Sequence, residues 1–384
     1  MKIALVTNES VEPRSTRSSM PIWIYNVASR LVRYHDVVVY SKREQKTKGE
    51  MPKLGRDKPR LSIGLPVFNG EKYLKEVLDS ILAQTYSDFE LVISDNASTD
   101  RTEQICREYA AKDRRIRYYR NEKNIGAPKN FNRVFELSFC EYFKWASSDD
   151  MHAPTYLQKC ISVLDTDPSI ILCHSKTGRI NEHGKLVGNY DRAAMARIDS
   201  WKPYERFGVF LSMRNPCWAL LGVIRASTLR ETPLQGSYIG ADRNLLAEIA
   251  LMGRIYEIPE YLFFGRDHPQ SYTRKFYEDK IVANAYNYRK HLAWWTQDEW
   301  STFPHLKNCL EYFRSVNRVR LKWSERLLCY DQIFKWFMNE GWISMGIDME
   351  NFLLRSSRLA RKLIPFVLLN LRRTVIPIIQ KMKQ

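Results

Sequence analysis

The sequence has no apolar run long enough to span a bilayer. Its longest candidate, at 363–371, is interrupted by Pro365, whereas a membrane-spanning helix needs about 20 apolar residues. The amino terminus, MKIALVTNESVEPR, turns polar after six positions and lacks the apolar core of a signal peptide. We therefore expect a cytoplasmic protein that is not integral to the membrane.

Closely spaced cysteine pairs are also missing. The seven cysteines are scattered and form no CxxC pair, which argues against both a disulfide framework and a structural zinc site. We expect buried, reduced thiols, as is typical of the cytosol. The sequence likewise contains no helix-turn-helix, RRM or zinc-finger pattern, so we expect no nucleic-acid partner.

Acidic residues are scarce relative to basic ones, and the imbalance is local. The chain has 60 Lys and Arg against 43 Asp and Glu, a net charge of +17. Residues 42–60 hold eight basic and three acidic residues, and residues 352–384 hold eight basic and no acidic ones. The rest of the chain is nearly balanced. Because 352–384 also carries a helical stripe of aliphatic residues, we expect it to contact an anionic membrane surface. The alternative is a helix that packs its apolar face on the protein, and Pro365 and Pro377 would interrupt either form.

What the sequence does contain is an α/β pattern. Its 384 residues suggest two or three units, or one large domain with extensions. Apolar β-rich runs at 61–68, 89–95, 116–121 and 142–150 alternate with helical periodicity, which predicts a mainly parallel sheet. The predicted domains are an accessory strand–helix–strand segment at 1–41, a basic linker at 42–59, an α/β domain at 60–275 and a helical extension at 276–384.

Polar residues follow the predicted strands where parallel sheets bind their ligands. Asn69, Asp95, Asn96 and the pair Asp149–Asp150 all occupy such positions. Adjacent carboxylates repel each other, and a divalent ion would relieve that repulsion. For the pair alone, a solvated turn with a helix cap is the simpler interpretation. Asp95 could accept hydrogen bonds from a base or from ribose hydroxyls, or form an Asx turn.

Two further candidates lie downstream. Asp242 precedes a predicted amphipathic helix, where a helix cap is the simplest interpretation. His268 follows Arg266 and Asp267 after an apolar run, and a lone histidine is usually a surface or packed residue.

Taken together, four segments resemble the family 2 glycosyltransferases with a GT-A fold. They are LSIGLPVFNGEKYLKEVLDSILAQTYSDFELVISDNASTDRT, NEKNIGAPKNFNRVFE, WASSDDMHAP and IGADRNLLAEIALMGRIYEIPEYLFFGRDHPQS, in the family's order over about residues 60–275. Residues 1–41 more weakly resemble the opening of a family 4 (GT-B) glycosyltransferase. This segment lacks a GxGxxG fingerprint, so we expect it to be an accessory segment or a dimer contact.

The resemblance implies roles for individual residues. Asp242 falls at the position of the general base. Asp149, the last Asp of the DxD motif, and His268 would bind Mn²⁺ or Mg²⁺. The first DxD position is Ser147, which removes one carboxylate. The expected nucleotide-sugar contacts are Pro66, Val67, Phe68, Asn69, Asp95, Asn96, Ser98, Asn124, Gly126, Asn130, Asp150 and Arg266.

The implied reaction is inverting, metal-dependent sugar transfer from a nucleotide-diphospho-sugar, with a UDP-sugar the leading expectation. The acceptor would be a saccharide or lipid-linked hydroxyl in cell-surface polysaccharide or lipopolysaccharide synthesis, at the inner face of the plasma membrane. One base suffices for a single displacement, unlike the carboxylate pair of most glycosidases. The alternatives are a nucleotidyltransferase, which would need a basic phosphate-gripping loop near the first strand, and a non-catalytic glycan- or nucleotide-sugar-binding scaffold, which Ser147 favours.

Overall fold

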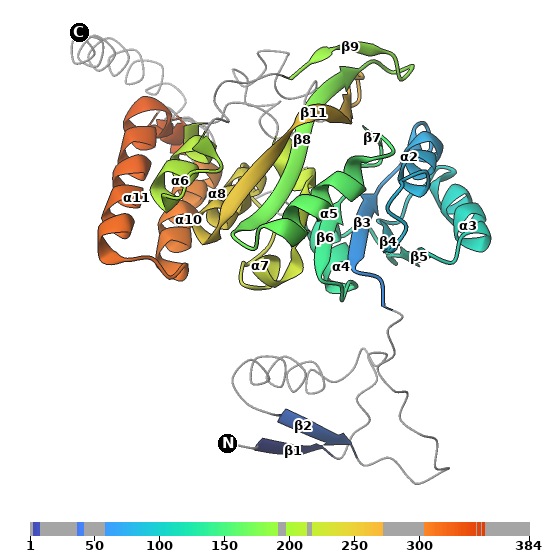
Figure 1. Ribbon diagram of the computed structural model, residues 1–384, viewed down its shortest axis with the longest axis horizontal. Coiled ribbons are helices and arrows are strands. Elements are labelled where there is room, and N and C mark those ends of the chain that lie inside the picture. The colour runs from blue at the N-terminus through green and yellow to red at the C-terminus, as the bar shows by residue number, and fades with distance from the viewer. Residues whose placement is uncertain are drawn as a thin grey trace, which may run out of the picture. The chain divides into compact units, whose positions relative to one another are not determined.

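The structure is a computed structural model of the full chain (Figure 1). It describes residues 3–7, 37–41, 58–190, 197–212, 217–271, 303–342, 344–346 and 348–349. The chain divides into two compact units between Asp57 and Lys58.

The first unit contains two short strands that the apolar runs predict. β1 (Ile3–Thr7) pairs in parallel with β2 (Val37–Ser41), with Ile3 opposite Val37. Parallel neighbours need a crossover connection. The predicted helix between them and the basic linker up to residue 57 lie outside the described residues.

The second unit is built on one mixed sheet. β3, β4, β5, β6, β8 and β11 run in one direction, and β7, β9 and β10 run in the other. β9 pairs only with β8, outside the main order. The strands of that order are β5 (Ile116–Arg120), β4 (Phe89–Asp95), β3 (Leu61–Val67), β6 (Tyr142–Trp145), β10 (Val223–Arg225), β8 (Ile170–Ile180), β11 (Arg254–Arg266) and β7 (Met151–His152), with β9 spanning Leu186–Asn189.

Helices cover both faces of this sheet because its central strands are buried on both sides. Along β3, the side chains of Leu61, Ile63 and Leu65 face one core, and Gly64 faces the other, where a Cβ would lie 2.6 Å from Val134 Cγ2. The first core is covered by α2 (Leu74–Leu82), α3 (Thr102–Lys112) and α5 (Tyr156–Thr166). The second is covered by α4 (Ala127–Glu136), α6 (Pro203–Ser212) and α8 (Ala241–Met252), with the short α7 (Ala226–Arg230) and η2 (Trp218–Leu221) nearby.

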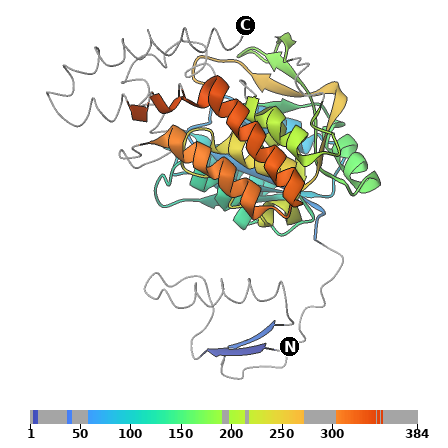
Figure 2. The same cartoon turned by 90° about the vertical axis from the view of Figure 1, so that its left-hand side faces the viewer.

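Two long helices form a further layer over α6 and α8 (Figure 2). α10 (Pro304–Arg318) packs on α8, and α11 (Trp323–Trp336), which continues into η5 (Phe337–Gly341), packs on α6. Tyr312 and Ile333 enter the same core as the second face of the sheet. No helix among the described residues is long and apolar enough to cross a membrane.

The α/β class, the mainly parallel strand directions and the helical region after the sheet are confirmed. All seven cysteines are free, and six are buried. The expectation that Asp242 precedes its helix is wrong, because it is the second residue of α8, which begins at Ala241. The residue before the helix is Gly240, with φ +82°. The basic tail at 352–384 lies outside the described residues.

Candidate active site at the strand ends

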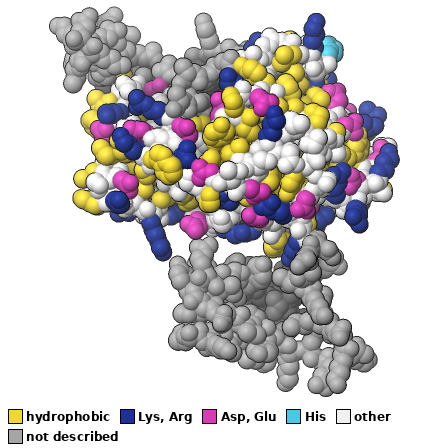
Figure 3. Space-filling view, in the orientation of Figure 1, with side chains coloured by type: hydrophobic (Ala, Val, Ile, Leu, Met, Phe, Trp, Pro, Cys, Tyr) yellow, Lys and Arg dark blue, Asp and Glu magenta, His cyan; other side chains and the backbone are white. Residues whose placement is uncertain are grey.

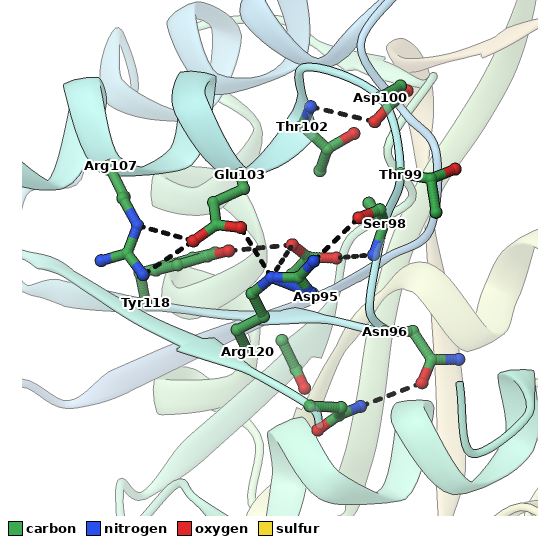
Figure 4. Close-up of polar contacts among 12 residues, drawn as sticks. Asp95, Asn96, Ser98, Thr99, Asp100, Thr102, Glu103, Arg107, Tyr118 and Arg120 are labelled. Atoms are coloured by element: carbon green, nitrogen blue, oxygen red, sulfur yellow. Dashed lines mark hydrogen bonds and ion pairs between the residues drawn. The ribbon is translucent and has the colours of Figure 1, made fainter. Parts of the chain in front are cut away.

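The loop after β4 is anchored by a buried carboxylate, Asp95 (Figure 4). The Ser98 backbone N–H donates to Asp95 Oδ1 at 2.8 Å, and the Tyr118 hydroxyl donates to Oδ2 at 2.8 Å. Arg120 Nε lies 4.0 Å from Oδ2. Since Asp95 is 0% exposed, this geometry favours a role in positioning the loop over the direct base contact expected from the sequence.

The ends of β3 and β4 are tied to each other. The Asn69 backbone N–H donates to Ser98 Oγ at 2.9 Å, and Asn69 Oδ1 accepts from the Thr99 N–H at 2.8 Å. Asn69 has φ +52°, a left-handed conformation that asparagine tolerates well. Pro66 and Val67 are buried, so Phe68, 48% exposed, and Asn69 are the groups at this strand end that a ligand can reach.

A network of amides holds the loop before α4. Asn96 Nδ2 donates to Asn124 Oδ1 at 2.8 Å, and Asn96 Oδ1 accepts from Asn121 Nδ2 and the Ile125 N–H. Gly126 directly precedes α4 and has φ +86°. Its N–H donates to Asn124 Oδ1.

Asn130 connects this network to the sheet. Its Nδ2 donates to the Ser94 carbonyl at 2.8 Å, while its Oδ1 accepts from Ser94 Oγ at 2.7 Å and Asn121 Nδ2 at 3.0 Å. Such fully satisfied buried amides fix one loop geometry, because a missing partner would leave a costly unpaired group.

Asp149 and His268 come together after β6 and β11. His268 Nε2 lies 3.0 Å from Asp149 Oδ2, and the Ser147 hydroxyl donates to Asp149 Oδ1. The His268 and Tyr73 ring centroids lie 4.8 Å apart, with the ring planes tilted by 56°. The serine at the first DxD position therefore orients the remaining aspartate.

Asp150 and Arg266 lie beside this pair but are buried. The Arg266 N–H donates to Asp150 Oδ1 at 2.9 Å, and burial, followed by the Asp149 charge, raises the pKa of Asp150. The Arg266 guanidinium donates to the Asp149 carbonyl at 2.8 Å and pairs with Glu76 at 2.7 Å. Because this guanidinium is 0% exposed, a positioning role is favoured over the diphosphate contact predicted from sequence.

Asp242 lies in the first turn of α8, half-buried, with the Arg243 N–H donating to Oδ1 at 2.8 Å. Burial raises its pKa, and the Cys217 thiol is its side-chain neighbour. Trp218, the residue after Cys217, packs on Phe263 and on Gly265. A Cβ on Gly265 would lie only 2.8 Å from the Trp218 ring. η2 and β11 thus connect Asp242 to the segment that carries Arg266 and His268.

Sequence reasoning missed several residues that build this site. Tyr118 and Asn121 lie on and after β5, the parallel neighbour of β4, so the carboxyl end of that strand was an available signal. The sequence contains no signal for Tyr73 and Glu76, because their contacts with His268 and Arg266 join segments some 190 positions apart.

The family comparison covers the first part of this site. The sequence model of Glycosyl transferase family 2 matches residues 62–220. Over this segment the chain is similar to glycosyltransferase family 2. Asp242, Arg266 and His268 follow the matched region.

Several curated relatives that match part of this chain also carry the name glycosyltransferase. An uncharacterized glycosyltransferase of Methanocaldococcus jannaschii is 32% identical over 136 residues, 35% of this chain and 47% of the relative. An uncharacterized glycosyltransferase of Rickettsia typhi is 34% identical over 30% of this chain and 36% of its own. The chondroitin synthase of Escherichia coli is 28% identical over 43% of this chain and 23% of its own length. The chain thus spans less than half of these relatives.

More distant matches occur among solved structures. TarS of S. aureus residues 1–349, solved with UDP-GlcNAc, is 15% identical with a TM-score of 0.45, covering 76% of this chain and 89% of that one. A mannosyltransferase of Pyrobaculum calidifontis, solved with GDP-Man and Mn²⁺, is 15% identical with a TM-score of 0.47, covering 91% and 88%. Matches this distant assign no substrate to the chain.

Asp149 and His268 carry donor atoms of the kinds that a divalent ion accepts. Carboxylate oxygen and imidazole nitrogen are ligands that Mn²⁺ accepts. Asp149 Oδ2 and His268 Nε2 lie 3.0 Å from each other. The buried His268 Nδ1 has no hydrogen-bond partner among the described residues. The described part of the chain contains no group of three or more His, Cys, Asp or Glu placed to hold a metal. Two protein ligands would therefore leave positions for water and phosphate oxygens.

Proposed function

We propose that this chain transfers a sugar, with inversion, from a nucleotide-diphospho-sugar to an acceptor hydroxyl. The observation that carries the proposal is the Asp149–His268 pair beside the anchored loops of β3 and β4, with Asp242 joined to it through η2 and β11. The similarity of residues 62–220 to Glycosyl transferase family 2 supports the reaction class.

In this proposal the loops at the strand ends hold the nucleotide, with Phe68 and Asn69 as the reachable groups. Asp149 and His268 would hold Mn²⁺ or Mg²⁺, which would supply positive charge where the diphosphate leaves. Arg266 and Ser147 keep Asp149 in place. Asp242 takes the proton of the acceptor hydroxyl, which alone is a poor nucleophile.

The pathway is also a proposal. The similarity to a chondroitin synthase supports a saccharide acceptor in cell-surface polysaccharide synthesis. The cationic, aliphatic tail at 352–384 supports peripheral attachment to the inner face of the plasma membrane, where a lipid-linked acceptor would be found.

Donor hydrolysis tests the reaction class. We expect one nucleotide-sugar from a panel of UDP- and GDP-sugars to be hydrolysed with Mn²⁺, and Asp149→Ala to lose this activity about a hundredfold or more. Hydrolysis of no donor would instead favour the non-catalytic scaffold, and full activity in Asp149→Ala would exclude Asp149 as a residue that the reaction needs.

The base is tested separately. Asp242→Asn preserves shape but removes the proton acceptor, so we expect transfer to fall about 10²- to 10⁴-fold while nucleotide affinity is unchanged. Because the carboxylate is the active form and burial raises its pKa, wild-type kcat/KM should fall as the pH drops through that raised value. A variant that keeps most of the transfer rate would exclude Asp242 as the base.

A further inference from the structure

The described chain concentrates its exposed apolar side chains on its last helices. Of its fourteen large, exposed hydrophobic residues, nine lie between Leu306 and Met349. They include Trp323 at 67% and Phe334 at 62% exposure. Single exposed apolar residues are ordinary, but a concentration of this kind marks an interaction surface.

Seven of these nine side chains, together with the partly buried Tyr330, form one face on the last helices. Leu306, Leu310 and Phe313 recur at helical spacing along α10. The corresponding stripe on α11 is Trp323, Leu327, Tyr330 and Phe334, and Met338 continues it on η5. The Phe313 and Tyr330 rings lie 5.7 Å apart, and the Tyr330 hydroxyl donates to Asn317 Oδ1 at 2.9 Å. Because these contacts join the two stripes, we call the combined surface the α10–α11 face. In Figure 3, yellow side chains interspersed with dark blue ones lie along the left edge, where Figure 1 shows these helices.

Charge selects among the possible occupants of this face. Residues 303–342 contain seven Lys and Arg and four Asp and Glu. A second copy of the face, or the +8 segment at 352–384, would bring like charges together. A nucleic acid would satisfy the charge but not the exposed aliphatic and aromatic groups. An anionic lipid bilayer satisfies both, since its headgroups attract the cations and its acyl boundary accepts Trp, Phe and Leu.

We propose that the α10–α11 face is a folded membrane-docking surface that binds anionic bilayers. It acts in addition to the tail and deepens the peripheral attachment put forward under the proposed function, on which it rests. The face would fix the orientation of the sheet at the membrane, because α10 and α11 pack directly on α8 and α6. A tail alone would only tether the enzyme.

Vesicle flotation of the full chain tests this proposal. The vesicles contain phosphatidylcholine with phosphatidylglycerol, or phosphatidylcholine alone. The variant is Leu327→Gln/Phe334→Gln, which removes two exposed side chains (50% and 62%) and keeps good helix formers. The matched control is Phe139→Gln/Leu186→Gln, which removes exposed side chains (62% and 56%) elsewhere.

We expect wild type and control to bind anionic vesicles equally, and the α11 variant to bind at least about tenfold more weakly at an unchanged Tm. Donor hydrolysis in solution should be equal in all three, which separates docking from the transfer reaction. Equal vesicle binding by the α11 variant would overturn the proposal and leave the tail as the sole anchor. A wild-type dimer in sedimentation velocity that this variant dissociates would also overturn it, in favour of a second copy.

Discussion

Lys144 is a buried cation in the centre of the sheet. It is 1% exposed, and its Nζ donates to the Trp145 carbonyl at 3.1 Å and to the Leu221 carbonyl. The Tyr156 ring centroid lies 5.0 Å away. Burial lowers the pKa of Lys144 to about 7. This residue joins β6 to the end of η2, and therefore helps to set the position of the Trp218 segment beside Asp242.

The lowered pKa makes stability depend on pH. Between about pH 7 and 10.5 the unfolded chain holds a proton on Lys144 that the folded chain has lost, so stability should rise with pH across this window. Relative to Lys144→Met, we expect the wild type to gain about 1 kcal/mol per pH unit in its free energy of unfolding. Urea unfolding of both proteins at pH 7, 8 and 9 measures this. A difference that stays constant with pH would show that Lys144 remains charged in the folded protein.

The limits of sequence reasoning are visible at this residue. In YFKWASSDD, a lysine inside a β-rich run gives no sign that it is buried, because its carbonyl partner comes from Leu221. The four parallel strands and the polar residues at their ends follow from local alternation and turn residues. The insertion of β10 between β6 and β8, and the burial of Arg266 against Glu76, depend on long-range pairing that no local pattern encodes.

At the scale of elements, hydrogen bonds from α4 hold the loops at the strand ends in place. Asn130 reaches from α4 to the Ser94 backbone and to Asn121, and Asn121 in turn holds Asn96. The positions of the loops after β4 and β5 therefore depend on this helix.

Asn130→Ala should weaken both stability and nucleotide binding. We expect a loss of about 1–3 kcal/mol in the free energy of unfolding, because buried partners are left unpaired, and a weaker nucleoside diphosphate affinity by calorimetry. Asn132→Ala is the matched control on the same helix, since its side chain pairs with the Gln235 backbone instead. It should cost stability without changing nucleotide affinity. Equal affinities in the two variants would rule out a role for Asn130 in forming the pocket.

At the scale of the whole second unit, α10 is bound to α8, the helix that carries Asp242. Glu248 of α8 is 1% exposed and accepts from Ser315 Oγ at 2.7 Å and from Arg318. Asn244 donates to the Asn308 carbonyl at 3.2 Å. The last helices are therefore a structural part of the second unit and not merely an extension.

Breaking the Glu248–Arg318 pair from one side should be costly. Arg318→Met leaves a buried carboxylate without its cation, and we expect a loss of about 3–5 kcal/mol in chemical unfolding. Arg314→Met, which removes a 62% exposed partner of Glu311, should cost under about 1 kcal/mol. Adding Glu248→Gln should restore much of the loss in Arg318→Met. If Arg318→Met and Arg314→Met lose the same amount, the buried pair is not what holds α10.

The strand order also affects folding during synthesis on the ribosome. β6 is complete at Trp145, but its free edge pairs with β10, which begins only at Val223. At about 5–20 residues per second, a ribosome exposes that edge for roughly 4–15 s before its partner has been synthesised. An unpaired edge is a template for joining other chains, so the nascent protein passes through a window of aggregation risk that ends before α10 or α11 has left the ribosome.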